Sequence, residues 1–114
     1  MTEGSDDLLR RVYEAIEIAR KTGKIKKGTN ETTKALERNV AKLVVVAKDV
    51  NPQEIVMHLK PLCAEKEVPH VATATREELG VAAGLNVPTT AVAITQEGEA
   101  ADLIKDIKSK LTSL

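Results

Sequence analysis

Leu43-Val44-Val45-Val46-Ala47 decides the fold, because it is a continuous apolar run rich in β-branched residues. Runs of this kind form strands that are covered on both faces. Strands are also predicted over residues 24–26, 70–73 and 90–94, with segments of helical periodicity between them. Alternating strands and helices predict an α/β protein, here a three-layer α/β/α sandwich with a small mixed central sheet.

Three helices are expected, the first and the last of them from apolar residues at helical spacing. The first is expected to begin at Ser5 and to end before Gly23. The second is expected over about residues 30–38, where Asn39 suits the left-handed position that follows a helix. The last is expected over residues 99–111. These helices supply apolar faces that can cover the predicted sheet.

Two further helices are predicted from their start signals. Asn51-Pro52 is expected to begin the third helix, with proline at the first helical position, and Pro61 is expected to break it before a short helical turn over residues 62–67. Thr75 is expected to cap the fourth helix, with Glu78 three residues later completing a capping box.

Length and composition predict a single domain over residues 1–114 with 42% apolar and 30% charged residues. No apolar run approaches the roughly 18 residues of a membrane span, and the acidic start MTEGSDD does not resemble a secretory signal. The only cysteine, Cys63, permits no internal disulfide, which favours a cytoplasmic protein. Cys63, His58 and His70 lack zinc-ligand spacing, so neither metal nor cofactor is expected. We expect a monomer in the free state, without membrane partners.

Charge is distributed unevenly although the formal net charge is zero. Residues 20–42 contain eight Lys or Arg and two Glu, a local charge of +6, and the rest of the chain carries −6. Such a basic region can steer a protein onto a phosphate backbone. Tyr13 is the sole aromatic residue, which excludes RNA modules that stack bases on aromatic side chains. RNA recognition would have to use a helix end, polar contacts and aliphatic surface.

The segment Lys26–Lys34 combines a basic stretch, a glycine turn and the start of a helix. Gly28 permits backbone conformations that other residues resist, and Thr29 or Asn30 is expected to cap the helix. Asn30, Glu31 and Lys34 fall on one helical face, where they would present an amide, a carboxylate and an ammonium group. This set suits a base edge beside a phosphate, but an ordinary solvated helix start is the alternative interpretation.

Longer strings resemble the L-seven-Ae family of ribosomal proteins, which bind kink-turn RNA. They are GKIKKGTNETTKALERNVAKLVVVAKDVNPQEIVMHL from Gly23, LCAEKEVPHV from Leu62 and LGVAAGLNVPTTAVAI from Leu79. The similarity extends from about Arg20 to Gly98, and the valine-proline loop is closer to archaeal members. It implies a non-enzymatic protein of ribonucleoprotein particles, with ribosomal RNA, box C/D and H/ACA guide RNAs and RNase P RNA as ligands and ribosomal and guide-particle core proteins as partners.

The resemblance also implies the residues that contact RNA. Asn30, Glu31 and Lys34 would read the guanines of the tandem sheared G·A pairs, Gly28 would allow close approach, and Lys27 and Thr29 would lie near phosphates. Lys24 and Lys26 are further phosphate candidates, or else solvated surface. The loop Leu85-Asn86-Val87-Pro88 would pack on loop nucleotides. Asn51, Ile55 and Arg76 would lie near the flipped-out nucleotide, where many relatives have glutamate in place of Asn51 and lysine in place of Arg76.

Other interpretations remain open at this point. Val87 could plug the core instead of contacting RNA. The chain could recognise a single ribosomal RNA site only, or be a small α/β enzyme with a phosphate-binding turn at Gly28–Glu31. No Ser/His/Asp, paired-carboxylate or phosphate-loop pattern accompanies that turn. We interpret Cys63 as a core residue and His58 as a surface or partly buried histidine.

Overall fold

The computed structural model describes residues 3–113, and it describes the side chains of residues 7–72 and 75–111. Met1, Thr2 and Leu114, which the predicted domain includes, lie outside the described residues. The elements in chain order are α1 (Glu3–Thr22), β1 (Lys24–Lys27), α2 (Thr29–Glu37), β2 (Leu43–Ala47), the 3-10 helix η1 (Gln53–Ile55), α3 (Leu59–Lys66), β3 (His70–Ala74), α4 (Arg76–Ala82), β4 (Ala91–Gln96), the 3-10 helix η2 (Gly98–Ala100) and α5 (Ala101–Ser113).

The four strands form one mixed sheet in the order β1-β4-β2-β3. β4 pairs antiparallel with both β1 and β2, whereas β2 and β3 are parallel. All five residues of β2 are buried, as its continuous apolar run predicts. β1 is an edge strand with mostly exposed side chains. The predicted mixed central sheet is therefore confirmed.

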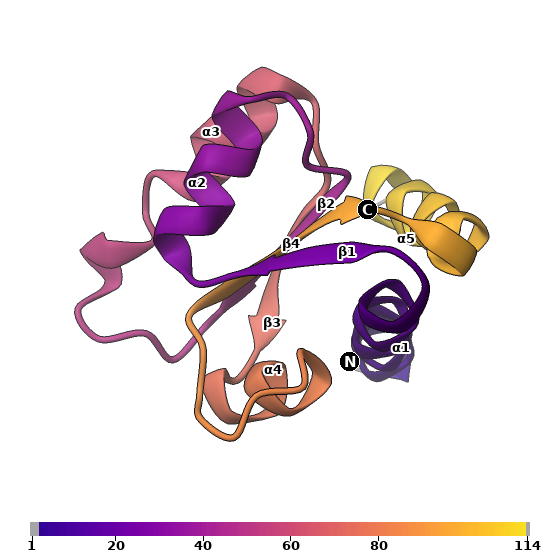
Figure 1. Cartoon of the computed structure of the whole chain (residues 1–114), viewed down its shortest axis with the longest axis horizontal. Coiled ribbons are helices and arrows are strands. Elements are labelled where there is room, and N and C mark those ends of the chain that lie inside the picture. The colour runs from indigo at the N-terminus through magenta and orange to yellow at the C-terminus, as the bar shows by residue number, and fades with distance from the viewer. Residues whose placement is uncertain (1–2, 114) are drawn as a thin grey trace.

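Helices cover both faces of this sheet (Figure 1). α2 and α3 lie together on one side, and α1, α4 and α5 lie on the other, where α1 contacts both α4 and α5. The predicted three-layer α/β/α sandwich is confirmed. The largest fully buried side chains come from the sheet and from both helical layers, and they include Ile16, Leu36, Leu43, Leu79 and Ile107.

The third helix differs from its prediction. Pro52 has extended backbone, with φ −78° and ψ 151°, so it precedes η1 and is not the first residue of a helix. η1 contains only three residues, and α3 begins later, at Leu59. Pro61 lies inside α3 and does not break it. It is in the first turn, where backbone N–H groups have no partner within the helix, so the N–H group that proline lacks costs no helical hydrogen bond.

Of the helix ends predicted from local signals, the start of α4 and the end of α2 are confirmed, and the start of α1 is not. Thr75 accepts a hydrogen bond from the backbone N–H of Glu78 at 3.2 Å, and its hydroxyl donates to the Glu78 carboxylate at 3.0 Å. The predicted cap of α4 is thus confirmed. The predicted start of the first helix at Ser5 is wrong, because α1 is already helical at Glu3. Asn39 has φ 60°, the left-handed position expected after α2.

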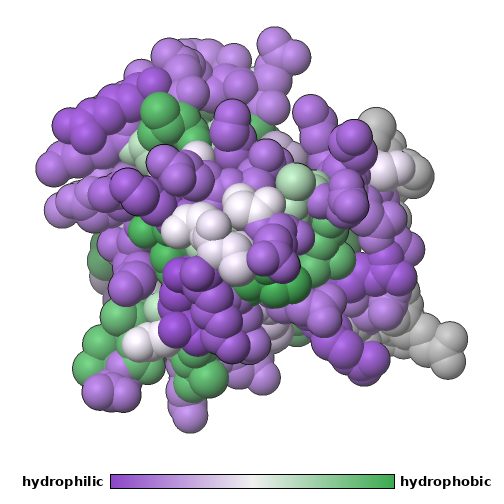
Figure 2. Space-filling view, turned by 45° about the vertical axis from the view of Figure 1, so that its right-hand side comes forward, coloured by the Kyte–Doolittle hydropathy of each residue, from purple (hydrophilic) through white to green (hydrophobic). Residues whose placement is uncertain are grey.

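Figure 2 shows a largely hydrophilic face on which hydrophobic side chains form separate patches. Within residues 3–113, no helix is both long enough and apolar enough to cross a membrane. Cys63 is buried, with 1% of its surface exposed, and this burial raises the pKa of its thiol to about 11. The interpretation of Cys63 as a core residue is confirmed.

Candidate nucleic-acid interface

One end of the sheet collects almost all the candidate residues. β1, β2 and β3 run in the same direction, and β4 runs against them. The segments that follow β1, β2 and β3 therefore meet the segment that precedes β4. These four segments contain Lys27–Glu31, Asn51–Ile55, Arg76 and Leu85–Pro88. The topology brings together residues that are up to about sixty positions apart in the sequence.

Gly28 forms the turn from β1 into α2. Its backbone has φ 94° and ψ 160°, a combination available to glycine and costly for residues with a Cβ atom. Its N–H donates to the carbonyl oxygen of Ala91 at 2.7 Å, so the turn is tied to the start of β4. A Cβ atom at Gly28 would meet nothing within 4 Å. The approach to this end of α2 is therefore open.

Gly28 is also the residue that caps α2, which corrects the prediction that Thr29 or Asn30 is the cap. Thr29 is the first helical residue, and its hydroxyl lies 2.7 Å from the hydroxyl of Thr90. Because α2 begins at Thr29, the first backbone N–H groups of the helix have no partner within it. Because the space beside Gly28 is open, an anion or a polar base edge could accept their hydrogen bonds.

The outer face of α2 presents the three predicted base-reading residues. The opposite face is buried through Thr32, Ala35 and Leu36, and this burial fixes the orientation of the helix. Asn30 is exposed, and Glu31 and Lys34 form an ion pair with 3.9 Å between Oε2 and Nζ. The two side chains are about half exposed, so their pairing contributes little to stability. A ligand with its own donors and acceptors could replace this ion pair at low cost.

The loop before β4 is packed tightly on α4. A Cβ atom at Gly80 would lie 2.3 Å from the carbonyl oxygen of Val87, so glycine is required for this approach. The backbone N–H of Thr89 donates to the carbonyl oxygen of Arg76 at 3.1 Å. The Val87 side chain is 62% exposed, which is incompatible with the alternative that it plugs the core. Val87 instead presents an aliphatic surface to solvent beside Asn86 and Pro88.

The segments after β2 and β3 are joined by one acidic side chain that the sequence reasoning did not single out. Asp49 accepts a hydrogen bond from the backbone N–H of Arg76 at 2.9 Å, and the Arg76 Nε lies 3.8 Å from the same carboxylate oxygen. Asn51 is exposed, and Ile55 is 43% exposed at the end of η1. Asp49 thus fixes the backbone at the start of α4 beside the loop that carries Asn51, and its ion pair with the half-exposed Arg76 side chain adds little stability.

A second missed contact joins α2 to the segment before α3. The Thr33 hydroxyl lies 2.8 Å from Nε2 of His58, and it also donates to the carbonyl oxygen of Thr29 at 2.8 Å. His58 is exposed, as one of the two interpretations of this residue expected. No pattern in the sequence predicts this contact, because Thr33 and His58 are 25 residues apart. The same holds for the contacts of Thr90 and Asp49.

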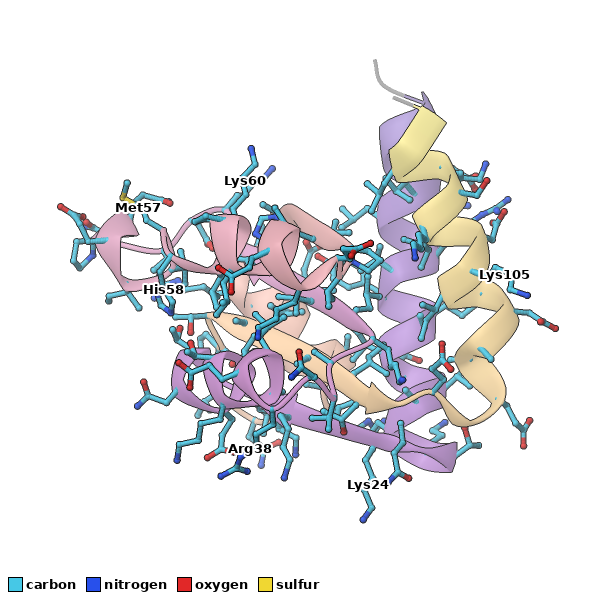
Figure 3. All side chains as sticks on the ribbon, turned by 90° about the horizontal axis from the view of Figure 1, so that it is seen from above. Lys24, Arg38, Met57, His58, Lys60 and Lys105 are labelled. Atoms are coloured by element: carbon cyan, nitrogen blue, oxygen red, sulfur yellow. The ribbon has the colours of Figure 1, made fainter. Side chains whose placement is uncertain are left out.

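The remaining basic candidates lie along β1 at increasing distance from this end. Lys27 is its last residue, whereas Lys24 pairs with Gln96 at the far end of β4. The two lysines are three positions apart along the strand, or roughly 10 Å. Figure 3 shows Lys24 and Arg38 projecting from the same side of the molecule, and Lys60 from the other side. The basic region of residues 20–42 therefore extends from the candidate interface along β1 and α2.

No group of three or more His, Cys, Asp or Glu that could hold a metal ion occurs among the described side chains. The arrangement offers hydrogen-bond donors, carboxylate acceptors, several cations and aliphatic surface. Such a set can bind a polyanion and read base edges.

Comparisons with known proteins agree with this architecture. The family model described as "Ribosomal protein L7Ae/L30e/S12e/Gadd45 family" matches residues 10–104. A solved structure of a Giardia lamblia protein, described as "15.5kD RNA binding protein", superposes with a TM-score of 0.89 at 31% sequence identity. The match covers 94% of this chain and 89% of the Giardia protein.

Proposed function

Because the chain belongs to the ribosomal protein L7Ae/L30e/S12e/Gadd45 family, we propose that it is an RNA-binding protein whose ligand is the kink-turn. A kink-turn is a sharply bent duplex element with tandem sheared G·A pairs. The observation that carries the proposal is the convergence of four chain segments at one end of the sheet. That end presents the exposed Asn30, Glu31 and Lys34 next to an open helix start, and the exposed Val87 on the neighbouring loop. The RNA-binding description of the Giardia protein also supports this proposal.

The α2 face would read the two guanines. A lysine ammonium donates to guanine O6 or N7, and a carboxylate accepts from the guanine N1 and N2 hydrogens. Glu31 and Lys34 lie close enough to form an ion pair, so they can address adjacent groups on adjacent bases. The open turn at Gly28 would let the RNA backbone approach the free N–H groups of α2, with Lys27 and Thr29 near phosphates.

The two neighbouring loops would hold the nucleotides that leave the stack. Val87 would pack on a splayed base through its exposed methyl groups, in a chain without Phe or Trp. Leu85, Asn86 and Pro88 would complete that contact, while Asn51, Ile55 and Arg76 would surround a flipped-out nucleotide. Because Asp49 accepts a hydrogen bond from the backbone N–H of Arg76, the start of α4 would be in place before the RNA arrives.

The protein would bend its RNA by selecting a conformation. The sheared pairs and the splayed nucleotide are presented together only in the kinked form, so binding favours that form. Moving a mostly extended RNA to a mostly kinked one requires about 5.5 kcal/mol of differential affinity. Several base contacts of about 1–3 kcal/mol each can supply this preference.

A role as a structural component of cytoplasmic ribonucleoproteins, without catalysis, follows from this proposal. Candidate ligands are ribosomal RNA, box C/D and H/ACA guide RNAs and RNase P RNA. Crosslinking in cells followed by sequencing of bound RNA would tell this broad role from recognition of a single ribosomal site. Recovery of one ribosomal RNA segment alone would favour the narrower role.

The decisive experiment places a fluorescent pair on the two arms of a kink-turn RNA in low magnesium, where the RNA is extended. Energy transfer should rise to saturation on addition of the wild-type protein, and much less with Glu31→Ala. A control RNA whose G·A pairs are changed to Watson–Crick pairs should bind weakly and stay extended. Equal affinity for both RNAs, or tight binding without a change in transfer, would contradict the proposal.

A further inference from the structure

The exposed side of α4 carries a ridge formed by Glu77 and Val81. It separates two hollows beside the proposed RNA interface. Val81 is 68% exposed, the largest exposed fraction among the large apolar side chains identified as exposed. One hollow, of about 430 Å³, lies between α4 and the loop that carries Val87. The other, of about 260 Å³, lies between α4 and α1 at Tyr13. Glu77 and Val81 line both hollows, so the ridge separates them.

The charged side chains that line the two hollows are all acidic. Glu17, Glu77 and Glu78 line the hollow at Tyr13, and neither hollow is lined by a lysine or an arginine. This composition contrasts with the basic region of residues 20–42, and it repels phosphates. The ridge is therefore unsuited to RNA, although it adjoins the loop that we propose to contact RNA.

One of these acidic side chains, Glu78, is also held in place. The Tyr13 hydroxyl donates to Oε1 of Glu78 at 3.0 Å, and the Thr75 hydroxyl donates to the same oxygen at 3.0 Å. Burial and the neighbouring Glu78 carboxylate raise the pKa of Tyr13 to about 12, so its hydroxyl stays protonated and keeps donating at neutral pH. A fixed carboxylate beside exposed apolar surface recognises a cation at lower entropic cost than a mobile one.

We propose that the Glu77–Val81 ridge and its two hollows form a docking surface for a lysine- or arginine-rich amphipathic segment of a protein partner. An apolar side chain of the segment would enter a hollow against Val81, and its cations would meet Glu17, Glu77 and Glu78. An exposed apolar anchor surrounded by complementary charge is typical of protein interfaces. The choice of a basic occupant rests on charge complementarity, because an acidic segment or RNA would be repelled.

The position of this surface gives the partner a second role, which rests on the proposed RNA function. Val87 and Pro88 line one hollow and also belong to the proposed RNA interface. A basic segment on the ridge would therefore lie next to bound RNA, and its outer cations could contact phosphates.

A defined peptide tests the docking surface in the absence of RNA. The full chain is titrated with a short helical peptide of leucine and lysine, and backbone amide signals are followed by NMR. Shifts should be confined to α4, the adjoining part of α1 and the 85–88 loop. Val81→Asp should weaken binding by roughly tenfold, as expected for loss of a central anchor, and Glu77→Lys should weaken it to a smaller extent. Both side chains are exposed, so neither variant should unfold the protein.

Matched controls separate this surface from general stickiness. Val40 is also exposed, at 44%, and lines neither hollow, so Val40→Asp should bind the peptide as wild type does. A peptide with glutamate in place of lysine should not bind. Equal binding of the two peptides, equal loss in Val40→Asp, or shifts at other surfaces would overturn the proposal.

Two alternative occupants give different results. Shifts at the ridge that appear when the concentration of the protein alone is raised would assign the surface to a second copy of the chain. A loss of kink-turn affinity in Val81→Asp as large as that in Val87→Asp would assign it to RNA. Either result would overturn the docking proposal, whereas a failure of all RNA binding would leave the peptide result unaffected.

Discussion

Replacing Gly28 with alanine should destabilise the protein through backbone conformation alone. Gly28 has φ 94° and ψ 160°, a region that is essentially restricted to glycine and costs other residues about 1–3 kcal/mol. Alanine would also stiffen the unfolded chain, which offsets about 0.4–1 kcal/mol. Since an added Cβ atom would meet nothing within 4 Å, no steric clash contributes. The expected net loss is about 1–2 kcal/mol of unfolding free energy.

Thermal unfolding followed by circular dichroism measures this loss. For a domain near 100 residues, 1 kcal/mol corresponds to about 4 °C or slightly more, so Tm should fall by roughly 4–8 °C. The change should be local. The amide of residue 28, which donates to Ala91, and the amide of Thr32, which donates to residue 28, should exchange faster with solvent, whereas those of β2 should not.

Gly80→Ala is the matched comparison, because there an added Cβ atom meets the carbonyl oxygen of Val87 at 2.3 Å. That variant should destabilise by displacing the loop, at a cost of about 1–3 kcal/mol for overpacking. Its exchange changes should appear at residues 85–88 and not at residue 28. An unchanged Tm in Gly28→Ala, or exchange changes spread over the whole sheet, would refute the reasoning about the turn.

Three further predictions concern single side chains. Glu31→Ala should cost about 1–3 kcal/mol of kink-turn affinity and reduce discrimination against guanine changes. Lys27→Ala should instead weaken binding of all RNAs alike and flatten the slope of affinity against salt concentration by about one unit. Titrations at several salt concentrations distinguish the two variants, and retained guanine discrimination in Glu31→Ala would contradict the assignment. Val87→Asp should weaken RNA binding with little change in Tm, because the side chain is 62% exposed; a collapse of Tm would mean that Val87 is buried in solution. Cys63 should resist thiol reagents at neutral pH, because it is buried and the pKa of its thiol is raised to about 11; rapid labelling of the folded protein would contradict this.

Local patterns predicted the elements whose structure depends on neighbouring residues in the sequence. The apolar run of β2 required burial on both faces, and Thr75 with Glu78 formed the expected cap, since each signal lies within a few positions. The prediction of the third helix failed at two prolines, because a proline is compatible with more than one local structure. Pro52 suggested a helix start and Pro61 a helix break, but the chain is extended at Pro52 and helical around Pro61.

The candidate site was predictable only in part for the same reason. Asn30, Glu31 and Lys34 share a face by helical spacing alone, so their grouping required no knowledge of the fold. The contacts that hold the surrounding loops, such as Thr29 with Thr90 and Arg76 with Asp49, join residues 61 and 27 positions apart. Those contacts depend on the strand order and on the register between strands, which no local pattern encodes. The exposure of Val87 likewise depends on how closely Gly80 lets the loop approach α4.

The pairing of the first strand with the last has a consequence for synthesis of the protein. Lys24 lies opposite Gln96, and the Gly28 turn is tied to Ala91, so the start of α2 is completed by residues made about sixty or more positions later. Closing a loop of that length is entropically costly until the contacts that reward it are present. On a translating ribosome the basic β1–α2 segment therefore emerges long before β4 can fix it. A nascent chain interrupted before β4 carries the positive charge without the organised surface, and it should bind nucleic acid without selectivity until the final strand is in place.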